Sequence, residues 1–380
     1  MKKRYIYILI VVLLIGGCNW TNGNRKTGVE SEISSPVVYA RWFTVEKGEG
    51  YDCINVRNPW DTTRSLHRYI LVPKGMDLPE NLPEGTLIRT PLEKVVVYSS
   101  VHCGIIDALG LEKVIAGVCE SRYIDIAFVK NGLENGSISD LGEASSPDVE
   151  KIIDIAPEAI IASPLENMGY GRIEKIGVPL IESVDYMEVT PLGRAEWIRF
   201  YALFFGREHK ADSIFNATAQ SYNNIKEIVR NVKFKPTVIS ETKTGSVWYV
   251  PGGKSYMANL FTDAGANYPW RDNPNSGSVP VSFETVLELG ENADIWVMKY
   301  NKPKDICYND LKNEYTGYEY FSAFKKRTIF ACNTGKVPYY EELPIHPDYI
   351  LKDLVWVFHP ELLTGYVPRY YKKMLITGNE

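Results

Sequence analysis

Six cysteines are the most reactive side chains in the sequence, and one of them stands in a distinctive setting. Cys18 follows directly on an apolar stretch and on the two small residues Gly16 and Gly17. A thiol in such a position can carry a lipid once the chain before it has been cleaved. We therefore expect Cys18 to become the lipidated N-terminus of the mature chain.

The residues before Cys18 have the composition of a signal peptide. Residues 2–4 are two lysines and an arginine, and the apolar run 5–15 is too short to cross a bilayer core of about 30 Å comfortably. Residues 14–18, Leu-Ile-Gly-Gly-Cys, resemble a bacterial lipobox. The alternative is ordinary cleavage at small residues beside an incidental cysteine. The pattern predicts an exported protein that a lipid tethers to the membrane.

The other cysteines cannot all pair with one another, because their number is odd. Export makes disulfides permissible, and Cys307 with Cys332 is one candidate bridge, but spacing alone does not settle connectivity. No CxxC or Cys/His spacing indicates structural zinc. The residues concerned are Cys53, Cys103, Cys119, Cys307 and Cys332.

The composition indicates a large globular body. A chain of 380 residues that is 45% hydrophobic can bury a substantial core, and its length suggests two domains. A formal net charge of -5 and the lack of a long basic run argue against a nucleic-acid partner. The 25 tyrosines and 8 tryptophans suit either a surface that grips large ligands or sugars, or core packing alone.

The elements begin after a spacer. Residues 19–36 are polar and lack periodicity, which is typical of a flexible connection. Residues 37–92 contain β-type stretches interrupted by proline and glycine and predict a β-rich extension. Residues 1–18, before this spacer, are assigned to the signal peptide with its lipobox cysteine.

Strand and helix patterns alternate in the next segment, residues 93–205, which we expect to form an N-terminal α/β lobe. Apolar runs at 95–98, 114–118 and 159–162 predict buried strands, and 104–109 and 148–155 predict helices. Such alternation predicts a mostly parallel sheet, with ligand loops at the carboxyl ends of the strands.

A long helical stretch follows. From Pro191 on, apolar residues recur every three or four positions for about forty residues, which predicts an amphipathic helix that Lys235-Pro236 closes. We assign residues 206–234 to a linking helix. The alternation then resumes in a C-terminal lobe, residues 235–380.

The second lobe repeats the organisation of the first. Strands are predicted at 237–240, 294–298 and 328–331, and an apolar helix at 349–358. The fold class is therefore α/β, with two lobes of mostly parallel sheets and flanking helices, joined by one long rigid α-helix, together with the β-rich extension.

Two glutamates occupy matching positions in the halves. Residues 146–161 and 281–297 each place a helix before a strand, with Glu150 and Glu284 in the first helical turn. A carboxylate there is favoured by the helix dipole by about 0.3–1 kcal/mol, so structure alone could explain each one. Their occurrence in both halves suggests a further purpose.

In these features the sequence resembles the substrate-binding proteins of ABC importers for iron-siderophores, haem and cobalamin. The resemblance covers roughly residues 92–363, and it rests on the order and spacing of several motifs. The segments that carry it are Val95 to Leu111, Pro147 to Ile161, Pro191 to Ile198, Val281 to Val297 and His346 to Asp348.

The resemblance implies partners. One glutamate on each lobe docks into arginine pockets of the permease in that family, and by position these are Glu150 and Glu284, unless they only cap their helices. We expect a monomer that faces the periplasm, works with an ABC permease and its ATPase, and binds a small-molecule metal chelate. It carries no cofactor of its own, although the ligand contains iron or cobalt.

The resemblance also places the ligand in the groove between the lobes, on loops that follow strands. Aromatic faces there can stack on a macrocycle or catecholate, and arginines can bind anionic groups. The candidates in the N-terminal lobe are Ser99, Ser100, His102, Glu120, Ser121, Arg122, Tyr123 and Ser163. Those in the C-terminal lobe are Glu241, Trp248, Tyr249, Trp270, Arg271 and Asp272, with the glycine loop 252–254 beside them.

Other chemistries fit less well. The run 252–255, Gly-Gly-Lys-Ser, lacks the first glycine of a phosphate loop because position 248 is Trp, and no GxSxG motif marks a hydrolase. Bare zinc or manganese would need several convergent ligands, whereas His102 and His346 are the only histidines suitably placed. We expect no enzyme and no resident metal. A surface glycan-binding lipoprotein, and less so an exported hydrolase, remain the alternatives.

Overall fold

The computed structural model describes residues 37–377. The signal peptide, the lipidation site at Cys18 and the spacer 19–36 predicted above lie outside these residues. Residues 35–380 form one compact unit by themselves. In the described part, no helix has both the length and the apolar character that a membrane span requires.

The β-rich extension predicted from the sequence is confirmed as a four-stranded sheet in the order β1-β2-β3-β4. The β1–β2 and β2–β3 pairs are antiparallel, and β3–β4 is parallel. One face buries Ile54, Val56, Tyr69 and Leu71 in the main core. The strands are β1 (Phe43–Gly48), β2 (Tyr51–Arg57), β3 (Ser65–Pro73) and β4 (Thr86–Thr90).

Two buried carboxylates fix the residues that lead into this sheet. Glu196 accepts the backbone N–H groups of residues 38–40 at 2.6–3.0 Å, and Arg199 Nη1 lies 2.6 Å from its Oε1. Glu188 accepts the N–H groups of residues 41–42 at 2.8 and 3.2 Å. Burial raises the pKa of Glu188. These bonds tie the start of the described chain to the N-terminal lobe.

The N-terminal lobe contains a parallel five-stranded sheet in the order β7-β6-β5-β8-β9. The strands predicted at 95–98, 114–118 and 159–162 are all present, and the first helix begins earlier than expected, at Ser100. The strands are β5 (Val95–Val97), β6 (Ile115–Val118), β7 (Ser139–Asp140), β8 (Ala159–Ala162) and β9 (Leu180–Glu182). The helices are α1 (Ser100–Ala108), α2 (Ala127–Asn135) and α3 (Val149–Ile155).

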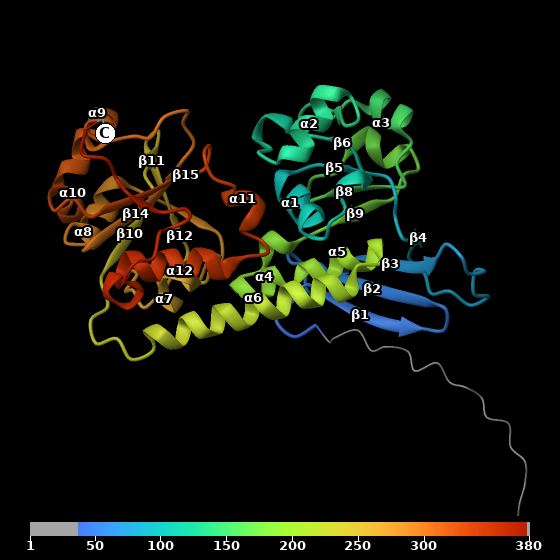
Figure 1. The fold of residues 1–380 in the computed structure, drawn as a ribbon, viewed down its shortest axis with the longest axis horizontal. Helices are drawn as coiled ribbons and strands as arrows, with labels where there is room; N and C mark the ends of the chain where they lie inside the picture. The colour runs from blue at the N-terminus through green and yellow to red at the C-terminus, as the bar shows by residue number, and fades with distance from the viewer. Residues whose placement is uncertain (1–36, 378–380) are drawn as a thin grey trace, which may run out of the picture. The chain divides into compact units, whose positions relative to one another are not determined.

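The helical stretch between the lobes is interrupted, unlike the continuous pattern that the sequence suggested. It consists of α4 (Pro191–Ala195), α5 (Trp197–Phe205) and α6 (Glu208–Val229). Gly206 ends α5 in the left-handed region at φ 61°, which glycine adopts without strain. The 22-residue α6 packs against α5 and against α12 (Pro347–Phe358) of the other lobe (Figure 1). It is therefore the helix that joins the lobes.

The C-terminal lobe has two sheets, in the orders β10-β14-β15-β16 and β11-β12-β13. In the first sheet β10, β14 and β15 are parallel, and β16 is antiparallel. The strands are β10 (Val238–Ser240), β11 (Lys243–Thr244), β12 (Val247–Pro251), β13 (Ser278–Val281), β14 (Ile295–Tyr300), β15 (Ile329–Asn333) and β16 (Lys372–Lys373). The helices are α7 (Tyr256–Asp263), α8 (Phe283–Gly290), α9 (Tyr308–Glu314), α10 (Ser322–Lys325), α11 (Tyr339–Glu342) and α12 (Pro347–Phe358).

Candidate functional site

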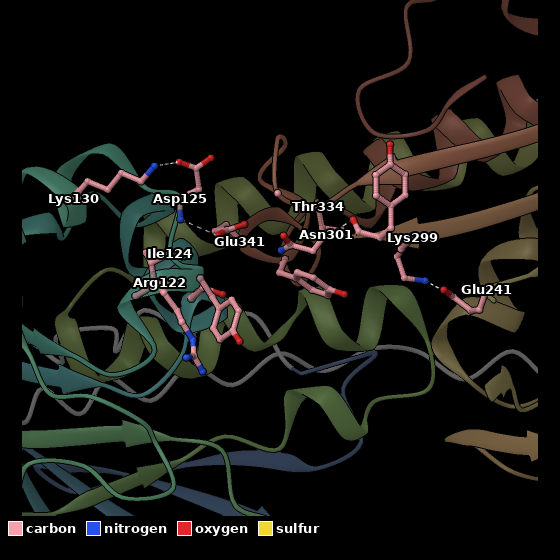
Figure 2. A pocket seen from close by; sticks show the side chains of 14 residues that line it. Arg122, Ile124, Asp125, Lys130, Glu241, Lys299, Asn301, Thr334 and Glu341 are labelled. Atoms are coloured by element: carbon pink, nitrogen blue, oxygen red, sulfur yellow. Dashed lines mark hydrogen bonds and ion pairs between the residues drawn. The ribbon is translucent and has the colours of Figure 1, made fainter. Parts of the chain in front are cut away.

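A cleft of about 570 Å³ is lined by both lobes. Its N-terminal wall comes from the loop after β6 and from the starts of α1 and α2, and its C-terminal wall comes from the ends of β14 and β15 and from α11. Figure 2 shows Arg122, Asp125 and Lys130 on one side and Lys299 and Glu241 on the other. The lining residues are Ser100, Arg122, Tyr123, Ile124, Asp125, Lys130, Glu241, Lys299, Tyr300, Asn301, Thr334, Gly335, Tyr340 and Glu341.

A second hollow of about 430 Å³ adjoins the cleft. It is lined by the segment after β10, by β12 and by the start of α7, and Tyr249 and Tyr256 contribute aromatic rings to it. Glu241 and Lys299 line both spaces. The two hollows therefore meet at this pair of charged residues.

Glu241, the residue that follows β10, forms an ion pair with Lys299 of the neighbouring parallel strand β14. Glu241 has a left-handed backbone at φ 64°, unusual for a residue with a side chain, and its carbonyl accepts Trp296 Nε1 at 2.8 Å. Burial acts to lower the pKa of Lys299, but the attraction of the Glu241 carboxylate for the ammonium group is the stronger effect. The pKa of Lys299 is therefore raised above its ordinary value. Lys299 thus remains a cation at neutral pH and can bind an anionic or carbonyl group.

The N-terminal wall offers a cation stacked on an exposed aromatic ring. The guanidinium carbon of Arg122 lies 4.7 Å from the centroid of the Tyr123 ring, and Tyr123 is 57% exposed. Arg122 Nη2 lies 2.9 Å from Glu143 Oε1. These side chains present a planar surface and a fork of donors toward the cleft.

The helix α11 links the two walls. It belongs to the C-terminal lobe but packs against α1 of the N-terminal lobe, where a Cβ on Gly104 would lie 2.3 Å from the carbonyl oxygen of Glu341. Glu341 Oε1 also accepts the Asp125 N–H at 3.4 Å (Figure 2). Burial raises the pKa of the Glu341 carboxyl. This interlobe contact lies at the edge of the cleft and depends on a glycine that leaves room for backbone.

Several sequence candidates lie at these two spaces. Ser100, Arg122, Tyr123 and Glu241 line the cleft, and Tyr249 lines the adjoining hollow. The others occupy different places in the N-terminal and C-terminal lobes.

In the N-terminal lobe the remaining candidates support the loops. His102 is fully buried, its Nε2 lies 3.3 Å from Ser163 Oγ, and burial lowers its pKa to about 4, so its ring is neutral at neutral pH. Glu120 accepts the Ala144 N–H at 3.0 Å, and Ser121 donates to Asp140 at 2.8 Å. Ser99 is the N-cap residue of α1.

In the C-terminal lobe two tryptophans are core residues. Trp248 is fully buried beside Trp296 and donates to the carbonyl of Ser240 at 2.9 Å. Trp270 packs on Tyr268, with ring centroids 5.5 Å apart. Arg271 and Asp272 are exposed and do not line the described cleft or the hollow beside it; their side chains are 3.8 Å apart.

The sequence interpretation missed much of the C-terminal wall. Lys299 and Tyr300 end β14, Asn301 follows it, and Thr334 and Gly335 follow β15. The rule that ligands bind at the carboxyl ends of parallel strands could have identified them. Tyr340 and Glu341 carried no comparable signal, because α11 is a short helix whose position depends on packing against the other lobe.

The two first-turn glutamates lie on the surface. Glu150 in α3 is exposed, and its Oε1 lies 3.1 Å from Arg172 Nη2. Glu284 in α8 is also exposed, and the free backbone N–H at the helix start, together with Ser282, lowers its pKa. Both carboxylates can therefore accept charged donors from another molecule. Among residues 37–377 no group of three or more His, Cys, Asp or Glu side chains is arranged to hold a metal ion.

Comparison with known proteins places these features in context. The family model for periplasmic binding proteins matches residues 95–334. An uncharacterized lipoprotein of Methanocaldococcus jannaschii is 27% identical over 100% of this chain and 98% of its own length. The petrobactin-binding protein of Bacillus subtilis is 27% identical over 110 residues, 27% of this chain and 33% of its own. The periplasmic heme binding protein of Pseudomonas aeruginosa superposes with a TM-score of 0.58 at 16% identity, over 76% of this chain and 100% of its own, a likeness of fold.

Proposed function

Since the chain belongs to the periplasmic binding protein family, we propose that it is the substrate-binding component of an ABC importer. In this role it captures a metal chelate, such as a ferric siderophore, haem or cobalamin, in the cleft between its lobes and delivers it to the permease. The lobes are residues 93–205 and 235–380, joined by the helix within 206–234.

The observation that carries the proposal is a cleft whose two walls come from different lobes and from the loops at the carboxyl ends of their strands. A site of about 570 Å³ suits a ligand the size of a drug molecule. The adjoining hollow at Tyr249 extends it for a larger ligand. A ligand bound between two lobes can report its presence through their relative position, as delivery to a permease requires.

The side chains support a bulky chelate. Tyr123, Tyr300 and Tyr340 bring aromatic rings to the cleft, and Arg122 and Lys299 bring cations beside them. Rings stack on planar organic groups, and cations bind carboxylate or catecholate oxygens. A chelate arrives with its metal already coordinated by its own atoms, so the protein needs to recognise the organic shell. The names of the petrobactin-binding and heme-binding proteins are consistent with such ligands.

The same role assigns a purpose to the surface glutamates and to Cys18. Glu150 and Glu284 bind arginines of the permease, and a lipid on Cys18 keeps the body at the membrane, facing the periplasm. The partners are then the permease with its ATPase. The relatives named lipoproteins support the anchor.

Titration with coloured ligands tests the function directly. Absorbance and tryptophan fluorescence of the purified chain are followed during addition of a ferric catecholate siderophore, haem or cyanocobalamin. We expect saturable binding of one of them, which is weakened when Arg122 and Lys299 are replaced by Met. A protein that responds to none of these ligands but binds oligosaccharides would contradict the proposal in favour of a glycan-binding role.

A further inference from the structure

A third hollow, of about 620 Å³, lies on the β-rich extension. It is formed by the first described residues, 37–44, and by the end of β2 with the following loop, residues 57–65. None of its lining residues belongs to the cleft or to the hollow beside the cleft. The function proposed above therefore leaves it without a role.

The hollow is strongly basic. Arg41, Arg57 and Arg64 line it, and all three are exposed. Thr62 and Ser65, which carry hydroxyl groups, line it as well. Carboxylates act on two of the three guanidinium groups, since Asp61 Oδ2 lies 3.4 Å from Arg64 Nε and the buried Glu188 carboxylate interacts with Arg41. Three cations with hydroxyl donors match the chemistry of a phosphate group, which arginine binds through parallel hydrogen bonds.

The backbone around these arginines is held in place. The buried carboxylates of Glu188 and Glu196 bind the N–H groups of residues 38–42, and the Arg57 N–H donates to the Trp42 carbonyl at 2.7 Å. In the loop, Asn58 Oδ1 accepts the N–H groups of residues 60 and 61 at 2.9 and 3.0 Å. The arginines are thus mounted on a fixed frame, which reduces the entropy lost when they bind.

The place of the hollow along the chain indicates its occupant. Val37, where the described chain begins, lines the hollow, and residues 19–36 separate it from Cys18. Eighteen residues span at most about 65 Å even when fully extended. A lipid on Cys18 would therefore hold the basic hollow within that distance of the membrane surface, where the phosphates of anionic lipids are concentrated.

We propose that Arg41, Arg57 and Arg64 form a docking site for the phosphates of anionic membrane lipids. The site acts with the lipid anchor proposed for Cys18 and turns the β-rich extension toward the bilayer. One lipid chain alone gives weak attachment, and a basic surface is a common second contribution. This inference is independent of which ligand the cleft binds.

The test uses the full lipidated chain in vesicles of phosphatidylcholine, alone or mixed with phosphatidylglycerol. We expect backbone hydrogen exchange of residues 58–64 to slow in the mixed vesicles, and the variant R41Q/R57Q/R64Q to lose that difference. In a second measurement, the chain from residue 18 with Cys18→Ser is sedimented with the same vesicles. Each arginine removed should lower its partition coefficient about fivefold, since a basic residue near an anionic surface contributes about 1 kcal/mol.

The control variant R230Q/K233Q/K235Q changes the charge equally just beyond the end of α6, on exposed residues remote in sequence from the hollow. It should sediment like the unmodified chain. Equal losses in both triple variants would show a general charge effect and overturn the proposal. So would equal binding to both kinds of vesicle, or saturable binding of inorganic phosphate without preference for anionic vesicles. Titrations with the ferric catecholate siderophore, haem and cyanocobalamin should give the same result in both variants as in the unmodified chain, which separates failure of this site from failure of the transport function.

Discussion

The ammonium group of Lys299 pairs with the carboxylate of Glu241 where the cleft and its adjoining hollow meet. Their side chains retain only 17% and 24% exposure, so each charge depends on the other for much of its solvation. A ligand that reaches both spaces must contact this pair. Such a ligand can contact both side chains while the ion pair stays intact, or it can replace one of them as the partner of the other.

Breaking this pair should cost stability. Replacing Glu241 with Gln leaves a largely buried ammonium without its counter-charge and should lower the free energy of unfolding by about 1–3 kcal/mol, between the values for exposed and buried pairs. Lys299→Met should have an effect of the same sign. In urea denaturation, the variant that carries both substitutions should regain much of the free energy of unfolding that each single substitution loses. If the two single effects simply added, the pair would not be a stabilising unit.

The exposed tyrosines should account for part of the ligand affinity. Tyr123→Ala and Tyr340→Ala should each weaken binding about 5- to 30-fold in the absorbance titration, through loss of about 1–2 kcal/mol of stacking and burial. Tyr→Phe at either position keeps the ring and should stay within about threefold of the unmodified protein. Tyr320→Ala, at an exposed tyrosine outside the cleft, is the matched control. Equal losses on Tyr→Phe would assign the effect to the hydroxyl groups instead.

The fold was largely predictable because its strands are continuous apolar runs with clear ends. Residues 159–162 were predicted as a strand and form β8 with the same bounds, since Pro157 and Pro164 bracket the run. The helical spine was less accurate. Nearly all residues of α5 are buried, so its sequence lacks the alternation of polar and apolar residues that would mark it as a separate helix. The end of α5 at Gly206 was therefore not recognised.

The site was less predictable because aromatic residues do not reveal from sequence whether they pack inside or face a ligand. Trp248 and Trp270 are core residues, whereas Tyr340 lies in the cleft. Lys299 was missed because the predicted strand ended at residue 298, one position before the side chain that matters. The α1–α11 contact joins residues far apart in sequence, and local patterns carry no information about it.

The glutamates proposed for docking should affect transport and leave binding intact. Glu150→Ala with Glu284→Ala should retain the affinity for the ligand, while uptake in cells or proteoliposomes falls sharply. Arg172→Ala should act in the opposite direction, because it releases Glu150 from a partner 3.1 Å away. Loss of affinity together with uptake would mean that the double variant disturbs the lobes and would refute the docking role.

His102 should make stability depend on pH. Its pKa is about 4 in the folded protein, lowered from 6.5 mainly by burial, with Asp185 and Arg194 nearby acting in opposite directions. Below about pH 6.5 the unfolded chain therefore takes up a proton that the folded chain excludes. Stability should fall progressively between about pH 6.5 and 4, by up to roughly 3 kcal/mol. His102→Gln should flatten this part of the profile of unfolding free energy.

The packing of α11 on α1 should set the separation of the lobes. A methyl group at Gly104 would lie 2.3 Å from the Glu341 carbonyl oxygen, a backbone atom that cannot rotate away, so Gly104→Ala must push the two helices apart. Because α6 resists bending, we expect the unmodified lobes to close by only a few degrees on ligand binding. Gly104→Ala should expand the ligand-free protein slightly in solution scattering and weaken the ligand, since the C-terminal wall of the cleft includes α11. Gly75→Ala, with nothing within 4 Å of the added carbon, should change neither quantity. A large contraction of the unmodified protein with ligand would show that α6 is a hinge and not a rigid spine.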